Sequence, residues 1–331
     1  MKKILYIGYY EAYGSPFADY LEKKNIKVKR FFIKKRPQKK FLSKKQIISN
    51  NIYALFKIIL NIRLLLNAKV YCTGASFAIL LIYRLFHIFL GKSSHLYIDN
   101  FYIHSLGNNK YIKRILCFLL HNKSLTLIVQ TPNELTYYKK LSSKVHLKFI
   151  PYCSDIDDEY NAKERDDGYI FTGGYTNRDY QLIIKLAKEM PQNKFVIIAS
   201  KLNKDLNIVP NNILVKRDID EDTFSQYLAS ASVVIIPLKE DVGSSGQMLC
   251  IQSMRYHKPI VYTNISSISY YFTKTSGIPY RMGDLSSLKN GVEKILSNKI
   301  NAKNIGEEAY RNSLNFTNIS RMKILNKIIE I

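Results

Sequence analysis

Acidic residues are scarce in the first half of this chain. Residues 1–150 contain 27 Lys and Arg but only 5 Asp and Glu, whereas residues 151–331 contain 23 and 21. Between Glu22 and Asp99 there is no acidic residue, while 17 basic ones occur, 12 of them between Lys23 and Lys45. A general bias toward lysine would affect both halves equally, so the positive charge is a property of the first half. Such a surface is typical of proteins that approach an anionic membrane or a nucleic acid.

Cysteines and long apolar runs are also few. Four cysteines are widely scattered, which argues against a disulfide framework or a zinc cage and favours a reducing compartment. The longest apolar run, Phe77 to Leu90, is interrupted by Arg84 and His87 and is shorter than the roughly 18 to 20 residues of a transmembrane helix. The first residues, MKKILYIGYYEAYG, become polar too soon for a signal peptide. We therefore expect a cytoplasmic protein with no membrane span and no metal.

Short apolar runs alternate with helical patterns along the whole chain, which predicts an α/β protein with parallel sheets. At 331 residues, two domains of about 150 residues are expected. The predicted strands are Lys3–Tyr9, Ile26–Ile33, Val70–Thr73, His95–Asp99, Leu125–Gln130, Val145–Ile150, Tyr169–Thr172, Phe195–Ala199, Ile213–Val215, Val233–Ile236, Ile260–Thr263 and Ile278–Tyr280. The main predicted helices are Phe17–Lys24, Ile48–Leu66, Ser76–Leu90, Gln181–Met190, Thr223–Ala229, Gln247–Tyr256, Leu285–Leu296, Ala302–Leu314 and Ile319–Ile331.

The segment Val233 to Thr263 carries the clearest functional pattern. A strand closed by Pro237 leads through a polar loop with the sequence GSSG, residues 243–246, into a helix and a second strand. Glycines allow the backbone to approach a ligand, and serine hydroxyls together with the amides of a helix start can bind a phosphate. Glycine and serine also end ordinary loops, so a plain turn is the alternative.

This segment resembles the donor-binding region of GT-B glycosyltransferases, particularly family 4. There a strand ending in proline leads through an acidic, glycine-bearing loop into a helix reading Glu-Ala-Met, followed by Gly-Lys-Pro and a strand. The corresponding residues here are Gln252-Ser253-Met254 and His257-Lys258-Pro259. Gln252 stands where the family has the glutamate that binds the nucleotide ribose, and Ser244 stands where it has a second acid. An amide can still bond a pair of hydroxyls as donor and acceptor.

The resemblance implies two Rossmann-like parallel-sheet domains facing a cleft. It places an acceptor- and membrane-facing domain at residues 1–152, a nucleotide-sugar domain at 153–314, and a final helix, 315–331, crossing back to the first domain. The residues implied to bind the donor are Gly14, Gly173, Gly174, Arg178, Glu240, Ser244, Ser245, Gly246, Gln247 and Gln252. No cofactor or metal is implied beyond the nucleotide-sugar itself.

Three residues are candidates for catalysis. Arg178 matches by position the cation that stabilises the leaving diphosphate in the family, and the alternative is a salt bridge with Asp179 or another surface acid. Asp99 ends a predicted strand, where a carboxylate would face a ligand crevice and could take a proton from an acceptor hydroxyl. His104 is a second candidate base. The alternative for Asp99 is a helix cap or a partner for a neighbouring lysine.

The resemblance implies transfer of a sugar, with UDP as the favoured nucleotide, to a lipid-linked or saccharide acceptor in cell-surface polysaccharide or glycolipid synthesis. Basic residues interleave with aromatic and aliphatic ones over residues 23–92, which predicts docking on an anionic membrane at the inner face of the cell membrane. An uncommitted basic surface and a nucleic-acid binder are the alternatives, and no recognisable RNA-binding motif favours the latter. A scaffold that has lost catalysis and a nucleotide-sugar epimerase are the competing functions.

Overall fold

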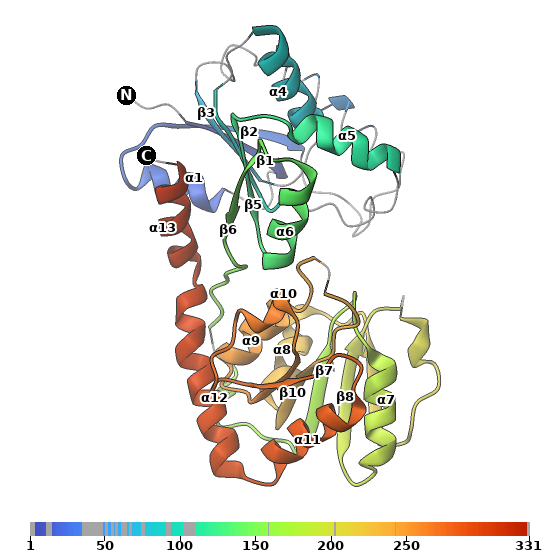
Figure 1. Cartoon of the computed structure of the whole chain (residues 1–331). Helices are drawn as coiled ribbons and strands as arrows, with labels where there is room; N and C mark the ends of the chain where they lie inside the picture. Colours follow the sequence, from blue (N-terminus) through green and yellow to red (C-terminus); the bar gives the residue numbers. More distant parts are fainter. Residues whose placement is uncertain are drawn as a thin grey trace. The chain divides into compact units, whose positions relative to one another are not determined.

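The computed structural model describes residues 4–10, 15–34, 49, 52–53, 56, 59–60, 65, 68–73, 77–90, 94–101, 110–157, 159–201, 203–241 and 243–329. The chain divides into two compact units (Figure 1). The first comprises Met1–Pro151 together with Met322–Ile331, and the second comprises Tyr152–Arg321. The predicted residues Gly14 and His104, and the basic loop from Lys35 to Lys45, lie outside the described residues.

The first unit contains a six-stranded parallel sheet in the order β2-β1-β3-β4-β5-β6. Its elements are β1 (Ile4–Tyr10), α1 (Pro16–Glu22), β2 (Val28–Lys34), β3 (Lys69–Thr73), α4 (Phe77–Leu90), β4 (Leu96–Asp99), α5 (Lys110–Leu120), β5 (Leu125–Val129), α6 (Pro132–Leu141) and β6 (His146–Phe149). Helices α4, α5 and α6 pack on one face of this sheet, whereas α1 and the end of the last helix pack on the other.

The second unit contains another six-stranded parallel sheet, in the order β12-β11-β10-β7-β8-β9. Its elements are β7 (Tyr169–Gly173), α7 (Tyr180–Glu189), β8 (Lys194–Ala199), β9 (Ile213–Arg217), α8 (Glu221–Ala229), β10 (Val233–Ile236), α9 (Gln247–Arg255), β11 (Ile260–Thr263), α10 (Ser266–Ser269), β12 (Ile278–Tyr280), α11 (Leu285–Leu296) and α12 (Lys299–Ser313). The last helix, α13 (Asn318–Ile329), begins in this unit and belongs to the first unit from Met322 onward. Helices α8 and α9 cover one face, and α7 and α11 cover the other.

The composition of the strands explains this layering. Strand β10, with the sequence VVII, is fully buried, because a central parallel strand is covered by helices on both of its faces. The same applies to β7 and β11, which flank β10 in the sheet. The predicted fold class, two Rossmann-like parallel-sheet domains, is therefore confirmed.

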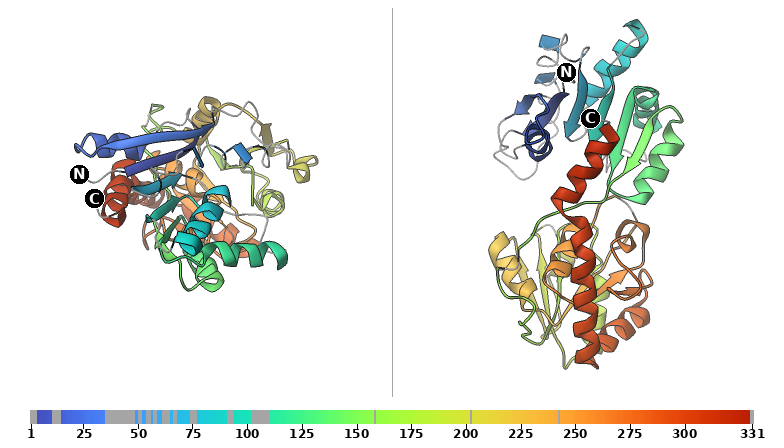
Figure 2. Two further views of the ribbon diagram at one scale, coloured as in Figure 1. Left: turned by 90° about the horizontal axis from the view of Figure 1, so that it is seen from above. Right: turned by 90° about the vertical axis from the view of Figure 1, so that its left-hand side faces the viewer.

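Helix α12 runs along the second unit beside α9 (Figure 2). The Oε1 atom of Glu307 lies 2.9 Å from Nζ of Lys163 and 3.3 Å from Nδ1 of His257 in the turn after α9. The hydrogen bond from Lys163 is the main cause that lowers the pKa of Glu307 below its ordinary value of 4.5. The carboxylate therefore stabilises the fold above that pH, and this contribution is lost as the pH falls through the lowered pKa.

We expect Glu307→Gln to lower the free energy of unfolding by about 0.5 to 1 kcal/mol at pH 7, the scale of a partly buried ion pair. The deficit relative to the parent protein should shrink as the pH falls from 4.5 through the lowered pKa of Glu307, below which the folded parent also lacks the carboxylate charge. Urea unfolding at several pH values measures both quantities, with Glu293→Gln, at an exposed position of α11, as the control. A deficit that stays constant between pH 7 and pH 3 would show that the ion pair is not its cause.

Candidate functional site

The order of strands in the second sheet locates the best candidate for a ligand site. The chain winds outward in opposite directions from the neighbouring strands β7 and β10, so the loops that follow these two strands diverge. In an open parallel sheet a crevice forms at this point, outside the carboxyl ends of the strands. Most of the predicted donor residues lie here. Gly173 ends β7, Gly174 and Arg178 follow it, and residues 240–247 follow β10.

Asn177 fastens the two loops to each other. Its Nδ2 donates to the carbonyl oxygen of Glu240 at 2.8 Å, and its Oδ1 accepts from the amide of Glu240 at 3.1 Å. The amide of Asp179 donates to the carbonyl oxygen of Pro237 at 2.9 Å, and residues Arg178 and Leu238 form an antiparallel bridge. The loops that follow β7 and β10 are thus joined to each other by hydrogen bonds.

Arg178 lies beneath the loop after β7. Its side chain is nearly buried, with Nε donating to the carbonyl oxygen of Gly173 at 2.9 Å and Nη1 donating to that of Thr176 at 2.8 Å. Burial lowers the pKa of Arg178 below its ordinary value. Among the residues that the structure describes, no carboxylate lies within ion-pair distance of the guanidinium, and Asp179 instead caps α7 by accepting from the amide of Leu182. The guanidinium therefore places a positive charge under the loop.

Gly174 allows the guanidinium to take this position. The residue has a φ of +129°, and a Cβ atom there would lie 2.4 Å from Nη2 of Arg178. The Tyr180 hydroxyl donates to the carbonyl oxygen of Gly174 at 2.6 Å, which fixes the loop from the other side. Any residue other than glycine would have to displace the arginine.

The second loop ends at Gly246, directly before α9. Gly246 has a φ of +84°, and a Cβ atom there would lie 3.1 Å from Cγ2 of Ile236. The first amides of a helix have no acceptor within the helix and favour an anion. Ser244 and Ser245 are partly exposed beside this helix start, and Glu240 is exposed, whereas Gln247 is buried.

Gln252, predicted to bind a ribose, lies one turn further along α9. Its amide nitrogen donates to Oγ of Ser225 on α8 at 2.8 Å, and only 9% of the residue is exposed. The amide thus joins two helices of the protein. Its contact with a ribose stays a prediction.

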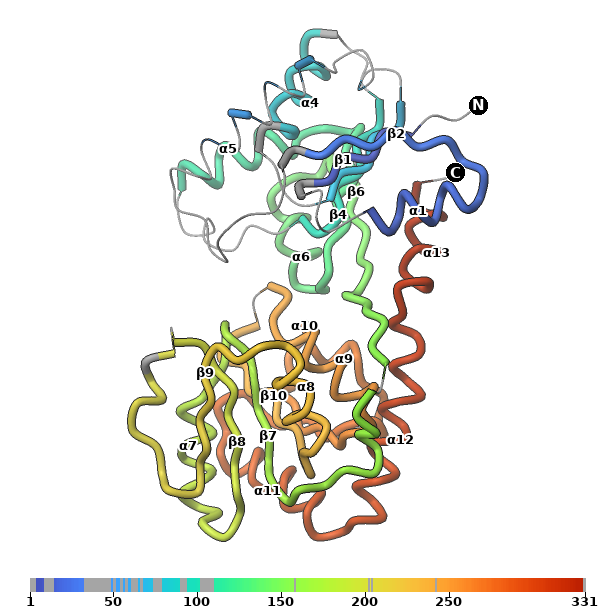
Figure 3. The backbone as a smooth tube through the Cα atoms, turned by 180° about the vertical axis from the view of Figure 1, so that it is seen from behind, coloured from blue at the N-terminus to red at the C-terminus, as the bar shows by residue number. Residues whose placement is uncertain are grey.

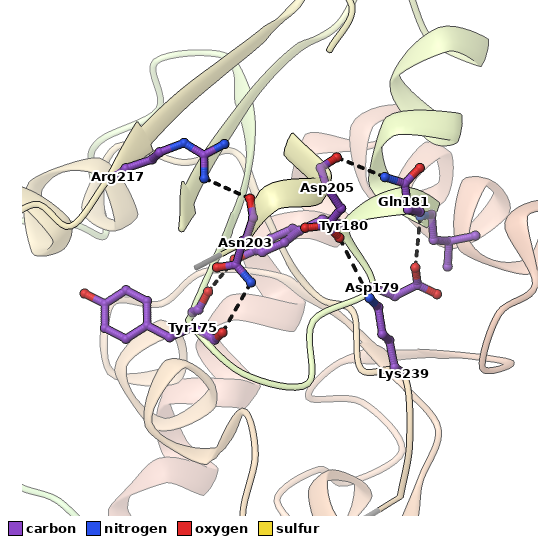
Figure 4. Close-up of polar contacts among 10 residues, drawn as sticks. Tyr175, Asp179, Tyr180, Gln181, Asn203, Asp205, Arg217 and Lys239 are labelled. Carbon is purple, nitrogen blue, oxygen red and sulfur yellow. Dashed lines mark hydrogen bonds and ion pairs between the residues drawn. The ribbon is translucent and has the colours of Figure 1, made fainter. Parts of the chain in front are cut away.

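Residues that sequence analysis did not identify make further polar contacts between the loops at this sheet edge (Figure 4). Nδ2 of Asn203, in the loop after β8, donates to the carbonyl oxygen of Tyr175 at 3.3 Å, and Arg217, at the end of β9, donates to that of Asn203 at 2.9 Å. Asp205 accepts from Gln181 through its carbonyl oxygen and lies 3.8 Å from Nζ of Lys239 through its carboxylate. The loops after β7, β8 and β10 are therefore joined. Sequence analysis could have identified these residues by their position, because polar residues follow three strands whose carboxyl ends lie at one edge of the sheet.

In the first unit, Asp99 occupies the carboxyl end of β4, as predicted. Its Oδ2 accepts from the hydroxyl of Tyr71 at 2.5 Å, its Oδ1 accepts from the amide of Asn100 at 2.9 Å, and 3% of the residue is exposed. A general base must come within hydrogen-bond distance of the substrate hydroxyl, and both carboxylate oxygens of Asp99 already accept hydrogen bonds within the protein. The catalytic role of Asp99 therefore stays a prediction.

Within the described part of the chain, no group of three or more His, Cys, Asp or Glu residues has the arrangement of a metal site. Burial raises the pKa of the Cys72 thiol to about 12 and that of Cys250 well above its ordinary value. These two thiols are consequently protonated and are poor metal ligands. The described helices also include none with the length and apolar character needed to cross a bilayer.

No protein-family model matches the sequence, and no curated protein matches it. Solved structures do match over the whole chain. Sucrose-phosphate synthase from Thermosynechococcus elongatus has a TM-score of 0.72 and 13% identity, with 100% of this chain and 98% of that chain covered. A glycosyltransferase from Rickettsia africae has a TM-score of 0.69 and 11% identity, covering 99% and 98%.

HepE from Anabaena, solved in complex with UDP and glucose, has a TM-score of 0.65 and 12% identity, with 100% of both chains covered. Similarity at these identities establishes the fold. The chain has the GT-B fold of these glycosyltransferases.

Proposed function

We propose that this protein is a glycosyltransferase that moves a sugar from a nucleotide-sugar donor to a lipid-linked or saccharide acceptor. The observation that carries the proposal is the sheet edge of the second unit where the strand order predicts a crevice. Two glycine-bearing loops are joined there over a buried arginine that has no carboxylate partner among the described residues. Such a crevice suits a diphosphate. The whole-chain similarity to nucleotide-sugar enzymes supports this reading, and the UDP named for HepE makes UDP the favoured nucleotide.

The chemistry explains why these groups belong together. When the bond between the sugar and the diphosphate breaks, negative charge grows on the departing phosphate oxygens. The backbone amides at Gly173 and at the start of α9, together with the charge of Arg178, would stabilise that charge without a metal. The amide of Gly174 donates to the carbonyl oxygen of Ile198 at 3.0 Å, so Gly174 would contribute through its lack of a side chain. Ser244, Ser245 and Glu240 would contact the donor from the rim, and Gln252 would bind the ribose if it leaves Ser225.

The first unit would receive the acceptor. In this proposal Asp99 serves as the base for the acceptor hydroxyl, with the Tyr71 hydroxyl holding it in place. The positive charge over residues 23–92 supports a location on the inner face of the cell membrane, where lipid-linked acceptors of polysaccharide or glycolipid synthesis are found.

Two competing functions make different predictions. A scaffold that retains the fold would bind no nucleotide or would bind it without turnover. An epimerase would convert a nucleotide-sugar in the absence of any acceptor. A transferase releases a free nucleoside diphosphate when both donor and acceptor are present. Without an acceptor it releases the diphosphate only slowly, by transfer of the sugar to water.

Thermal unfolding in the presence of UDP, GDP, ADP and CMP tests the donor site directly. A ligand at about 100 times its dissociation constant stabilises the folded protein by about 2.7 kcal/mol. We expect UDP alone to raise the melting temperature. If none of the four nucleotides does so, the donor site is lost and the scaffold becomes the better description.

The hydrogen bonds of Asn177 should matter for donor affinity. Asn177 has a φ of +54°, so we choose Asn177→Gly, which keeps this backbone conformation and removes both side-chain bonds to Glu240. If losing these hydrogen bonds weakens donor binding by about 1 kcal/mol, the donor KM should rise roughly fivefold. Asn161→Gly is the matched control, because Asn161 also has a positive φ, of +50°, and is exposed away from the crevice. Equal KM values for the two variants would contradict the role of Asn177.

A further inference from the structure

Helix α4 presents an apolar face to solvent. Ile79, Leu80 and Tyr83 are buried against the sheet. On another side of the same helix, large apolar residues recur at helical spacing and remain exposed: Leu81 (39%), Leu85 (37%), Ile88 (47%) and Phe89 (78%). Residues at positions i, i+4, i+7 and i+8 lie on one face of a helix, so these four side chains form a continuous stripe.

Helix α5 repeats this arrangement beside α4. Leu116, Leu119 and Leu120 are buried, whereas Tyr111 (75%), Ile115 (53%) and Phe118 (46%) are exposed at positions i, i+4 and i+7. The two helices pack on the same face of the first sheet and contact each other (Figure 3). The guanidinium of Arg84 on α4 lies 5.0 Å from the centre of the Phe118 ring on α5. The two stripes therefore adjoin, and we call them together the α4–α5 face.

Only positive charge accompanies this face in the described first unit. Lys110, Lys113 and Arg114 are exposed on α5. The described acids of the unit lie elsewhere: Asp19 and Glu22 are on α1, which covers the opposite face of the sheet, while Asp99 and Glu134 are buried. An apolar stripe flanked by basic residues and free of acids is complementary to an anionic lipid surface. Two copies of the face would instead bring like charges together.

We infer that the α4–α5 face docks on an anionic lipid bilayer, with Phe89, Tyr111 and Phe118 entering the interface between headgroups and acyl chains. This inference deepens the proposed function and rests on it in one respect, namely that docking delivers the acceptor site to a lipid-linked acceptor. The inference adds α5 to the membrane-binding surface, whereas the sequence indicates only the basic stretch of residues 23–92. Exposed Ile52, Phe56 and Leu60, which are helical, extend the apolar character of the same unit.

Sedimentation of the full chain with lipid vesicles tests the inference. We expect binding to vesicles that contain phosphatidylglycerol, weaker binding to phosphatidylcholine alone, and a decrease with added salt. The triple variant Phe89→Ser, Tyr111→Ser, Phe118→Ser should lose at least about tenfold in vesicle affinity, since three apolar side chains no longer leave water. The matched control replaces three exposed apolar residues of the second unit, Ile208→Ser, Met282→Ser and Ile300→Ser, and should bind like the parent. Equal binding by the two triple variants overturns the inference.

Two further measurements separate the remaining outcomes. Sedimentation velocity without lipid reports self-association, and a dimer of the parent that the α4–α5 variant dissolves would show that the face binds a second copy, which overturns the lipid assignment. Thermal stabilisation by UDP is recorded on the same variants. A UDP shift retained by a variant that no longer binds vesicles supports docking separate from the donor site. Vesicle binding without a thermal shift from any of UDP, GDP, ADP and CMP refutes the proposed function and leaves the docking surface intact.

Discussion

Replacing Gly246 by aspartate is expected to abolish the thermal shift produced by UDP and to reduce turnover by at least about a hundredfold. The new carboxylate would stand at the start of α9, where the proposal places a phosphate. Two unit charges of the same sign 4 Å apart repel by about 4 kcal/mol at an effective dielectric constant of 20, which is sufficient for an effect of this size. Thermal unfolding with and without UDP, followed by a turnover assay, measures both.

Backbone strain must be separated from charge in this experiment. Gly246 has a φ of +84°, and a Cβ atom would lie 3.1 Å from Ile236, so any side chain costs some stability. Gly246→Asn is the matched control, because asparagine has nearly the same shape, tolerates a positive φ and carries no charge. We expect the asparagine variant to keep a reduced UDP shift. If the two variants bind UDP equally, the start of α9 does not face a phosphate.

The strands could be predicted from the sequence because their environment leaves a simple pattern. Runs such as Val233–Ile236 and Ile260–Thr263 contain no charged residue. Helices cover both faces of these strands, so every side chain in them is buried and apolar residues are favoured at each position. Each of the twelve strands in the described part of the chain overlaps a predicted one. The position of the candidate site follows from the same pattern, since the glycines after β7 and β10 fall at the ends of adjacent strands.

Helix α5 was not predicted, and its composition explains why. Its buried residues, Leu116, Leu119 and Leu120, are confined to its second half, and Lys113 and Arg114 interrupt the apolar pattern before them. An exposed apolar stripe further obscures the periodicity, because exposed and buried sides are then both hydrophobic. The exposed apolar residues of α5, on which the proposed docking depends, are therefore also the reason that its helical pattern was missed in the sequence.

Contacts that depend on tertiary packing were also beyond the sequence. The family resemblance predicts that Arg178 lies near the donor, but the bonds of Arg178 to the carbonyl oxygens of Gly173 and Thr176 result from the path of one loop. Likewise, Gln252 donates to Ser225 because α8 packs beside α9, and no spacing along the chain indicates that pairing. The residue types of a site can be read from motifs, whereas the partners of each side chain come from the fold.

Replacing Arg178 by alanine is expected to lower kcat by about tenfold or more, the usual effect of removing one group that stabilises charge in the transition state. The guanidinium has two roles here: it supplies positive charge beneath the loop, and it holds two carbonyl oxygens of that loop. Loss of charge alone should lower kcat, whereas a loosened loop should raise the donor KM. Steady-state kinetics with varied donor concentration separates these effects, and circular dichroism confirms that the variant is folded.

Arg178→Lys distinguishes the two roles further. Lysine keeps the charge but has one ammonium group in place of the planar fork, so it cannot reproduce the bonds to both Gly173 and Thr176. We therefore expect a kcat between those of the parent and the alanine variant, with a raised KM. A lysine variant as slow as alanine would assign the effect to loop geometry, because charge without the fork would then be of no use. Near-normal kinetics of Arg178→Ala would remove this residue from the mechanism and leave the amides of the two loops as the only stabilising groups in the proposal.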